Sequence, residues 1–158
     1  MINMKAERQF IGNSTYRSRL VDGHFHTELC PHGSGDRTAL MIEKAIELRI
    51  EKVCLTEHAP LPKAFEAEYG GDKVAYDTAS LKLNQVDSYL ELGRELQRAY
   101  GTHIDISLGF EVDYIPGFES DIQDFLDRYG PLTDDNILSV HFMAGVGGKY
   151  YCVDYNTE

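Results

Sequence analysis

The 158-residue sequence is short of cysteine, of basic residues and of long apolar runs, and each shortage excludes a class of protein. No apolar run approaches the roughly 18 residues of a membrane-spanning helix, and the first nineteen residues are too polar for a secretion signal. The three cysteines, Cys30, Cys54 and Cys152, are odd in number and lack paired spacing. We therefore expect a protein of the reducing cytoplasm that has no membrane partner.

Lysine and arginine together number 15 against 26 acidic residues, which gives a formal charge of −11. This charge disfavours a nucleic-acid backbone as the main partner unless bound metal ions invert the local field. A chain of this length forms one domain with a reasonable core. We assign residues 1–19 to a polar leader, either a mobile terminus or a short cap, and residues 20–158 to the domain itself.

Histidine, by contrast, is concentrated, because three of the six histidines fall within residues 21–33. If residues 20–26 form a strand, side chains alternate between its two faces, so His24 and His26 project from the same face. The loop that follows can fold His32 back over this pair. Two interpretations of the pair remain open: two ligands of one metal ion, or a hydrogen-bonded polar pair at a strand end.

The rest of the chain alternates strands with helices, as judged from β-branched runs and from apolar residues at helical spacing. The predicted strands span residues 20–26, 52–58, 104–111 and 137–140, and the predicted helices lie near residues 36–49, 80–100 and 118–129. Ser34 to Asp36 contain the candidate N-cap of the first helix, and residues 150–153 predict a short hairpin or strand. Residues 59–78 lack a sustained period and are interpreted as a surface excursion, a candidate lid or substrate loop. This order predicts an α/β fold of parallel βαβ units, whose ligands bind at the carboxyl ends of the strands.

Every predicted strand ends at a residue that can bind a metal ion. These residues are His24 and His26 on the first strand, then His58, Glu111 and His141. Each of them alone is more often a hydrogen-bonded structural histidine or a solvated carboxylate. Because parallel strands end at the same edge of a sheet, their joint occurrence indicates a metal site. The sixth histidine, His103, follows a helix end and is interpreted as a structural or surface residue.

Four ordered motifs resemble the PHP (polymerase and histidinol phosphatase) superfamily. They are His24-Phe25-His26 with His32, Thr56-Glu57-His58, Gly109-Phe110-Glu111 and Ser139-Val140-His141. Within that superfamily, Asp22-Gly23-His24-Phe25-His26-Thr27, Glu57-His58-Ala59-Pro60 and Leu138-Ser139-Val140-His141-Phe142 look most like the histidinol-phosphate phosphatases of histidine biosynthesis. The resemblance covers about residues 20–155. It implies a distorted (β/α)7 TIM-like barrel, of which this chain would contain about the first four βα units.

The resemblance also implies a metal centre with up to three divalent ions, reported as Zn, Mn or Fe in such enzymes. By analogy the ligands divide among the ions as His24 and His26 for the first, Glu111 and His141 for the second, and His32 and His58 for the third, with Glu111 bridging the first two. Imidazole and carboxylate suit such ions, and paired ions generate hydroxide at neutral pH and neutralise the charge of a phosphate monoester. No catalytic residue beyond the metal ligands is assigned.

The chain departs from the family pattern in two respects. Glu57 stands where many superfamily members carry aspartate, and the sequence has neither a histidine after His141 nor an Asp-x-His near its end. Three ligands expected from later strands are therefore missing, so the chain resembles the N-terminal half of such a phosphatase. Arg37 and Lys63 are the local candidates for phosphate contact, and Asp22 is a candidate orienter of one imidazole or else a solvated aspartate.

The leading expectation is a metal-dependent phosphomonoesterase that hydrolyses L-histidinol phosphate to L-histidinol and phosphate, present here as an incomplete copy. One alternative is another phosphoesterase or a nuclease of the same superfamily. The acidic charge and the lack of a basic groove interleaved with aromatic residues disfavour the nuclease. The other alternative is an inactive metal-binding fragment that acts as half of an assembly by self-association through an open sheet edge.

Overall fold

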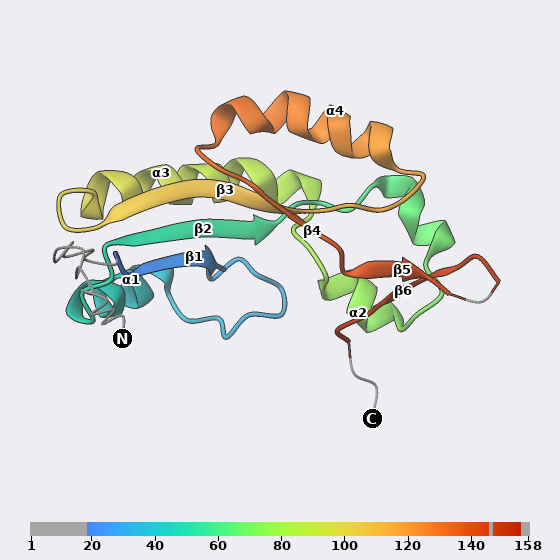
Figure 1. Cartoon of the computed structure of the whole chain (residues 1–158), viewed down its shortest axis with the longest axis horizontal. Coiled ribbons are helices and arrows are strands. Elements are labelled where there is room, and N and C mark those ends of the chain that lie inside the picture. Colours follow the sequence, from blue (N-terminus) through green and yellow to red (C-terminus); the bar gives the residue numbers. More distant parts are fainter. Residues whose placement is uncertain (1–18, 146, 156–158) are drawn as a thin grey trace, which may run out of the picture.

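The fold is a curved, parallel four-stranded sheet, seen in a computed structural model that describes residues 19–145 and 147–155. The strands β1 (Val21–Phe25), β2 (Lys52–His58), β3 (Asp105–Asp113) and β4 (Ile137–Ser139) lie in the order β1-β2-β3-β4 (Figure 1). All three pairings are parallel, as predicted for successive βα units. Apart from Arg19, which pairs with Glu51, the predicted polar leader lies outside the described residues.

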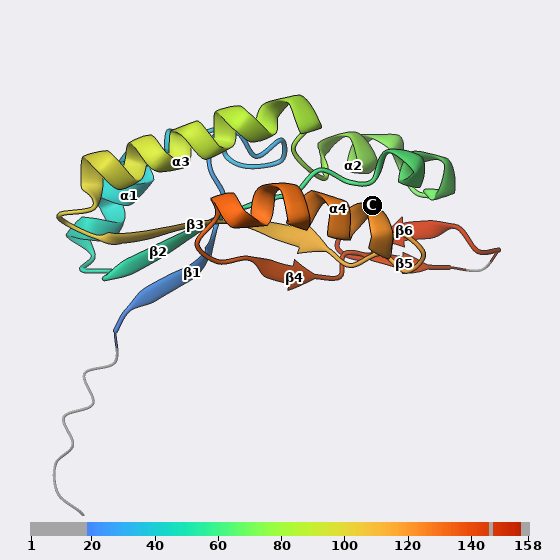
Figure 2. The same ribbon diagram turned by 90° about the horizontal axis from the view of Figure 1, so that it is seen from above.

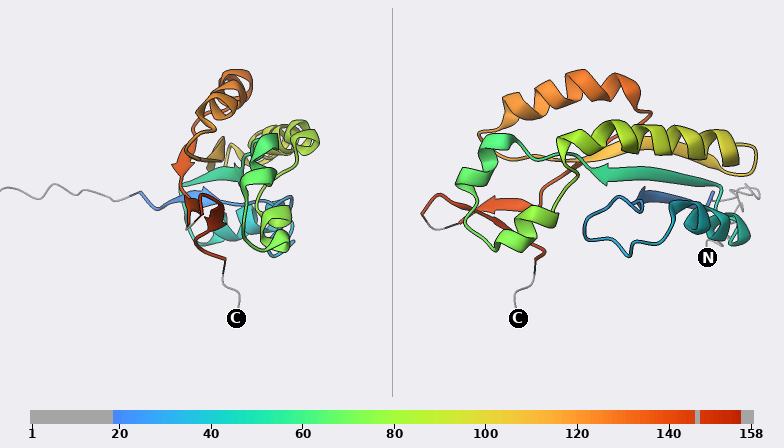
Figure 3. Two further views of the ribbon diagram at one scale, coloured as in Figure 1. Left: turned by 90° about the vertical axis from the view of Figure 1, so that its right-hand side faces the viewer. Right: turned by 180° about the vertical axis from the view of Figure 1, so that it is seen from behind.

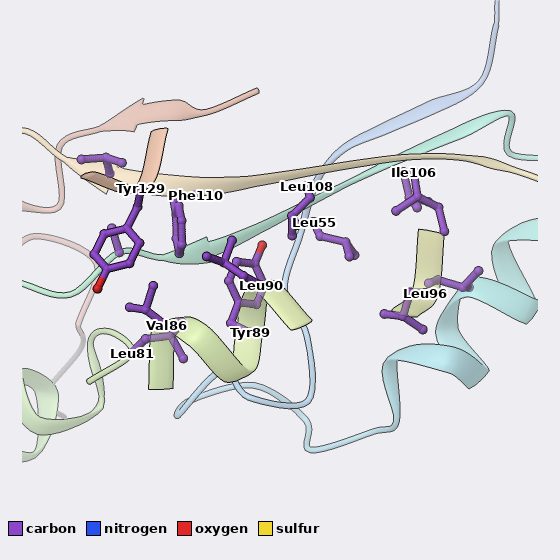
Figure 4. Close-up of a cluster of buried hydrophobic side chains, with 14 of the residues drawn as sticks. Leu55, Leu81, Val86, Tyr89, Leu90, Leu96, Ile106, Leu108, Phe110 and Tyr129 are labelled. Carbon is purple, nitrogen blue, oxygen red and sulfur yellow. The ribbon is translucent and has the colours of Figure 1, made fainter. Parts of the chain in front are cut away.

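Three helices cover one side of this sheet. They are α1 (Thr38–Glu47), α3 (Val86–Tyr100) and α4 (Glu119–Tyr129), and the end-on view of Figure 3 and the top view of Figure 2 place all three along its outer face. The core lies between α3 and the central strands, where Leu90 packs near Leu55 and Leu108 (Figure 4). The prediction of an α/β fold of parallel strands is confirmed for four strands, and among the described residues the covering helices follow the first three of them.

A buried tyrosine joins the two central strands to α3. The Tyr89 hydroxyl donates to the Gly109 carbonyl oxygen at 2.6 Å and lies 3.3 Å from the Glu57 amide nitrogen, which donates to it. The side chain is fully buried, so both hydrogen bonds are shielded from competing water. This contact fixes the carboxyl ends of β2 and β3 relative to each other, just where the candidate site residues follow.

Helix α1 does not begin as the sequence suggested. The N-cap expected between Ser34 and Asp36 is wrong, because Arg37 occupies that position without a capping side chain. The Glu28 carboxylate instead accepts from the Thr38 amide at 2.6 Å, and the Thr38 hydroxyl accepts from the Glu28 amide at 3.0 Å. The Glu28 carboxylate, ten residues before Thr38, thus supplies the missing cap. It also links the histidine-rich loop, the segment between β1 and α1, to the start of α1.

Residues 59–78 are not an irregular excursion, because they contain the 3-10 helix η1 (Lys63–Glu68) and the helix α2 (Lys73–Thr78). Phe65 is fully buried against Ile115 and Phe142, which come from distant parts of the chain. These tertiary contacts order a segment that has no periodicity of its own.

Another 3-10 helix, η2 (Leu83–Gln85), leads into α3, and η3 (Gly130–Leu132) follows α4. The predicted hairpin is present as β5 (Phe142–Ala144) and β6 (Tyr150–Cys152), which pair antiparallel beyond the carboxyl end of the sheet (Figure 1). It is joined to the 59–78 segment by a hydrogen bond of 2.8 Å from the Gly70 amide to the Tyr150 carbonyl oxygen. Among the described residues, no helix is both long and apolar enough to cross a membrane.

Candidate metal centre

The buried carboxylate of Glu111 lies at the centre of four imidazole rings. Its Oε2 atom is 2.8 Å from Nε2 of His24 and 3.3 Å from Nδ1 of His58. The same oxygen lies 3.5 Å from Nε2 of His26, and Oε1 lies 3.3 Å from Nε2 of His141. Five of the six residues singled out from the sequence therefore surround one point, although they span more than a hundred positions of the chain.

Strand register explains this convergence. His58 is the register partner of Glu111 in the β2–β3 pair, so the two side chains start side by side. The β1–β2 register shifts between Asp22 and Phe25, and the rings of His24 and His26 end with their centroids 4.9 Å apart. The expectation that these side chains meet at the carboxyl edge agrees with the geometry, and their role as metal ligands stays a prediction.

His32 does fold back toward the pair, as expected. Its ring centroid lies 5.0 Å from that of His58 and 6.1 Å from that of His26. Its Nδ1 atom is 2.8 Å from the carbonyl oxygen of Thr78, at the end of α2. The 59–78 segment thus contributes directly to the site, while the assignment of His32 and His58 to one shared ion remains a prediction.

His103 lies at the opposite end of the sheet, before β3 begins at Asp105. This position agrees with its interpretation as a structural or surface residue.

Two groups of side chains in this region have spacing suited to a cation. Their members are His24, His26 and Glu111 in the first group, and His58, Glu111 and His141 in the second. In each group one potential ligand atom per residue lies within 4.8 Å of the others, and Glu111 belongs to both. The buried Nδ1 atom of His58 has no hydrogen-bond partner among the described residues, a costly arrangement that a cation would relieve. The nitrogen and oxygen donors present fit Zn, Mn or Fe.

Two histidines of the centre have displaced pKa values. Burial lowers the pKa of His58 from 6.5 to about 4, although the nearby Glu111 carboxylate opposes this shift. A hydrogen bond to the Asp113 carboxylate raises the pKa of His141 from 6.5 to about 9, against the effect of burial. At neutral pH, His58 therefore offers a free lone pair, whereas a metal ion must displace a proton from His141.

These pKa values predict how the stability of the metal-free chain depends on pH. His141 binds its proton more tightly when folded, so its contribution is complete below pH 6.5 and is lost as pH rises toward 9. His58 binds its proton less tightly when folded, so stability also falls as pH drops from 6.5 toward 4. We expect the free energy of unfolding, measured by urea titration with a chelator present, to be greatest near pH 6.5. In Asp113→Asn the free energy of unfolding should change less between pH 6.5 and 9. A free energy of unfolding of the unsubstituted chain that rises over this range would contradict the account.

Two carboxylates at the site were not assigned from the sequence. Asp113 is buried, and its Oδ1 atom lies 2.9 Å from Nδ1 of His141 and accepts from the His141 amide. Glu57 is fully buried, and its Oε1 atom lies 3.3 Å from Nδ1 of His26. Carboxylates that contact the second ring nitrogen orient a histidine. Two features of the sequence could have identified these carboxylates. Asp113 lies two residues after Glu111 and so on the same face of the strand, and Glu57 places a charge within the buried strand β2.

The structure shows where three more weakly assigned residues lie. The sequence left Asp22 open as an orienter of one imidazole or a solvated aspartate, and in the structure its carboxylate accepts from the backbone amide of His24 at 3.3 Å. Lys63 lines a cavity of about 500 Å³ that is bounded by α4 and shares Asp113 with the cavity beside the histidines. The cavity beside the histidines, of about 190 Å³, is lined by His32, His58, Thr78, His141, Cys152 and Asp154, among others. In the described part of the chain, Arg37 lines neither cavity and Lys63 does not line the cavity beside the histidines, so phosphate contact by these two residues stays a prediction.

Comparison with known proteins decides the family. The sequence profile of the PHP domain matches residues 22–157. The chain belongs to the PHP domain family. This PHP chain is 40% identical over 135 residues to the histidinol-phosphatase of Bacillus subtilis (strain 168), a match that covers 85% of this chain and 48% of that protein.

Solved structures of similar proteins agree with the observed fold. The crystal structure of HisK from Listeria monocytogenes matches with a TM-score of 0.83 and 42% identity, over 86% of this chain and 50% of that one. The histidinol phosphate phosphatase of Lactococcus lactis, solved with zinc, L-histidinol and phosphate, matches with a TM-score of 0.62 and 25% identity, over 82% of this chain and 42% of that one. The PHP chain spans about half the length of the relatives it matches.

Proposed function

We propose that this PHP chain provides the metal-binding part of a phosphomonoesterase that hydrolyses L-histidinol phosphate to L-histidinol and phosphate. The observation that carries the proposal is the single buried carboxylate, Glu111, shared by two groups of imidazoles at the carboxyl end of a parallel sheet. Ligands bind at this end in such folds. The relatives named as histidinol-phosphatases supply the substrate class.

The ligands follow from the two groups. His24 and His26 would hold one ion and His58 and His141 a second, with Glu111 in both groups, so this grouping moves His58 from the third ion, where the resemblance placed it, to the second. His32, beside His58, is the proposed ligand of a third. When bound, Zn, Mn or Fe supplies Lewis-acid chemistry, which polarises the phosphate and neutralises charge on its oxygens.

The residues of the chain orient these ligands and shape the substrate cavity. Asp113, 2.9 Å from Nδ1 of His141, favours a proton on that nitrogen and leaves Nε2 directed at Glu111. Among the described residues, no lysine or arginine lines the cavity of about 190 Å³, whereas Asp113 and Asp154 do. A phosphate dianion in this acidic cavity needs cations for charge neutralisation, which favours a metal-dependent reaction.

The same features favour a small monoester over a nucleic acid. The cavity of about 190 Å³ accommodates only a small group, and the formal charge of −11 repels an extended polyanion. We place the reaction in the reducing cytoplasm, because Cys30, Cys54 and Cys152 are free thiols in the structure.

Phosphate release from L-histidinol phosphate by the 158-residue chain, supplied with Zn or Mn, tests the proposal. We expect release that falls to background in His24→Ala, because that change removes a ligand of the first group. Leu48→Ala, on the exposed end of α1, is the matched control and should keep the rate. Excess nonspecific DNA should not compete with the monoester. A metal-loaded chain that releases no phosphate would overturn hydrolysis by these residues alone.

A second candidate is a metal-binding half that works only within an assembly. The observation that favours it is the sheet itself, since among the described strands β1 and β4 each pair on one edge only. Exposed apolar side chains lie at both edges, with Val21 51% and Leu138 67% exposed. This candidate predicts self-association in sedimentation experiments, metal uptake and no turnover. A strictly monomeric chain at high concentration would exclude it.

A further inference from the structure

A third group of potential ligands lies on the side of His26 that faces away from Glu111. It comprises His26, Cys30 and Glu57, whose potential ligand atoms lie within 4.8 Å of one another. Cys30 and Glu57 are both buried, with 7% and 0% of their surfaces exposed. This group differs from the two groups around Glu111 because it contains a thiol.

Two consecutive turns of the histidine-rich loop place the Cys30 thiol there. The Cys30 amide donates to the Thr27 carbonyl oxygen, and the Gly33 amide donates to the Cys30 carbonyl oxygen, both at 3.1 Å. Gly33 also packs tightly on this residue, since a Cβ atom added to it would lie 3.1 Å from Cβ of Cys30. The loop therefore holds the thiol in a defined position beside the Glu57 carboxylate.

The polar atoms of this group are incompletely satisfied by the protein. Oε1 of Glu57 accepts from the Thr27 amide at 2.6 Å. Among the described residues, Oε2 of Glu57 and Nδ1 of His26 have no hydrogen-bond partner, and both are buried. A proton between Nδ1 and Oε1, 3.3 Å apart, would still leave the buried Oε2 atom unpaired. A bare buried carboxylate oxygen is costly, and a cation would satisfy all three side chains at once.

We propose that Cys30, Glu57 and Nδ1 of His26 form an auxiliary site for a thiophilic divalent ion such as Zn²⁺. Thiolate, imidazole and carboxylate are the usual protein ligands of Zn²⁺. Bonds of about 2.0–2.3 Å bring tetrahedral ligand atoms to within roughly 3.7 Å of one another, so only small inward movements are needed. On binding, the S–H bond of Cys30 breaks, the S–Zn bond forms and the proton passes to solvent.

The auxiliary site shares one imidazole with the centre around Glu111. Nδ1 of His26 faces Glu57, whereas Nε2 of the same ring lies 3.5 Å from Oε2 of Glu111. The site depends on a different donor set and requires no turnover, so it goes beyond the proposed phosphatase function. With both sites occupied, the ring of His26 would bridge two ions as an imidazolate, so its remaining N–H proton would also pass to solvent, and this shared ring couples the two metal sites.

Cobalt substitution tests the auxiliary site, because a Co²⁺–thiolate bond gives a charge-transfer band in the near ultraviolet. Cys152 lies beside His58 and His141 in the site cavity, so the starting protein carries Cys54→Ser and Cys152→Ser, which leaves Cys30 as its single thiol. We expect the band in this protein and its loss on adding Cys30→Ser. Glu57→Gln should move the titration midpoint to higher Co²⁺ concentration.

Uptake of Mn²⁺, which prefers oxygen and nitrogen donors, provides the control for the centre around Glu111. We expect Cys30→Ser to leave Mn²⁺ uptake and the circular dichroism spectrum unchanged. The proposal is overturned if the single-thiol protein shows no band, or if the band survives Cys30→Ser. It is also overturned if Cys30→Ser abolishes Mn²⁺ uptake together with the band, since Cys30 would then act only as support for the loop. Loss of phosphatase activity plays no part in these outcomes, so the two proposals fail separately.

Discussion

Replacing Glu111 by Gln is expected to abolish paired uptake of divalent ions while changing the fold little. Glu111 is the residue common to both groups of ligands, so one substitution removes a ligand from each. Gln has nearly the same volume but no negative charge, and the four surrounding imidazoles then have no carboxylate to offset a dication. We expect the affinity for divalent ions to fall by more than about 10–100-fold. That range is the usual loss when a residue that only hydrogen-bonds to a metal ligand is replaced.

Equilibrium dialysis against Zn²⁺, with metal counted by elemental analysis, measures this loss. Glu47→Gln is the matched control, because Glu47 is an exposed residue at the end of α1 whose one ion pair within residues 19–145 and 147–155 is with Lys44. Urea unfolding of the metal-free proteins separates lost ligation from lost structure. Unchanged metal content in Glu111→Gln would contradict the bridging role of this carboxylate.

Gly109→Ala is expected to cost the chain at least ~3 kcal/mol of stability or to prevent folding. A Cβ atom at this position would lie 1.6 Å from the carbonyl oxygen of Asp135 and 2.8 Å from its carbonyl carbon. The Asp135 backbone cannot easily move away, because the residues on both sides of it are hydrogen-bonded to β3. Asp134 accepts from the Leu108 amide, and Asn136 accepts from the Phe110 amide, both at 2.9 Å.

Urea unfolding followed by circular dichroism checks the effect of Gly109→Ala. The matched control is Gly130→Ala, because an added Cβ atom at Gly130 meets no atom of the described chain within 4 Å. We expect the control to unfold at the wild-type urea concentration. If Gly109→Ala does the same, the close approach of β3 to the segment before β4 is wrong.

The sequence predicted the convergence of the candidate ligands because that convergence depends on regular geometry. Alternation along the predicted strand 20–26 places His24 and His26 together, although β1 ends at Phe25, and parallel strands bring His58 and Glu111 to the same edge. His58 and Glu111 are also register partners in the β2–β3 pair, so their side chains are in direct contact. Strand β3 extends past Glu111 to Asp113, which is how a second carboxylate reaches His141.

The features that the sequence did not predict all depend on contacts between distant residues. The cap of α1 comes from Glu28, ten residues away, and no local rule identifies it. Phe65 and Phe142 pack together across the 59–78 segment and the hairpin, with ring centroids 5.0 Å apart, so periodicity within either segment carries no signal. The contact of Glu57 with His26 likewise joins β2 to the end of β1, and only the packed sheet shows it.

The central claim is that the imidazoles around Glu111 hold divalent ions. Anomalous diffraction at the zinc edge, from crystals of the chain grown with Zn²⁺, tests it most directly. The account predicts peaks on two sides of the Glu111 carboxylate, one beside His24 and His26 and the other beside His58 and His141. Zinc bound elsewhere, with no peak beside Glu111, would contradict the account.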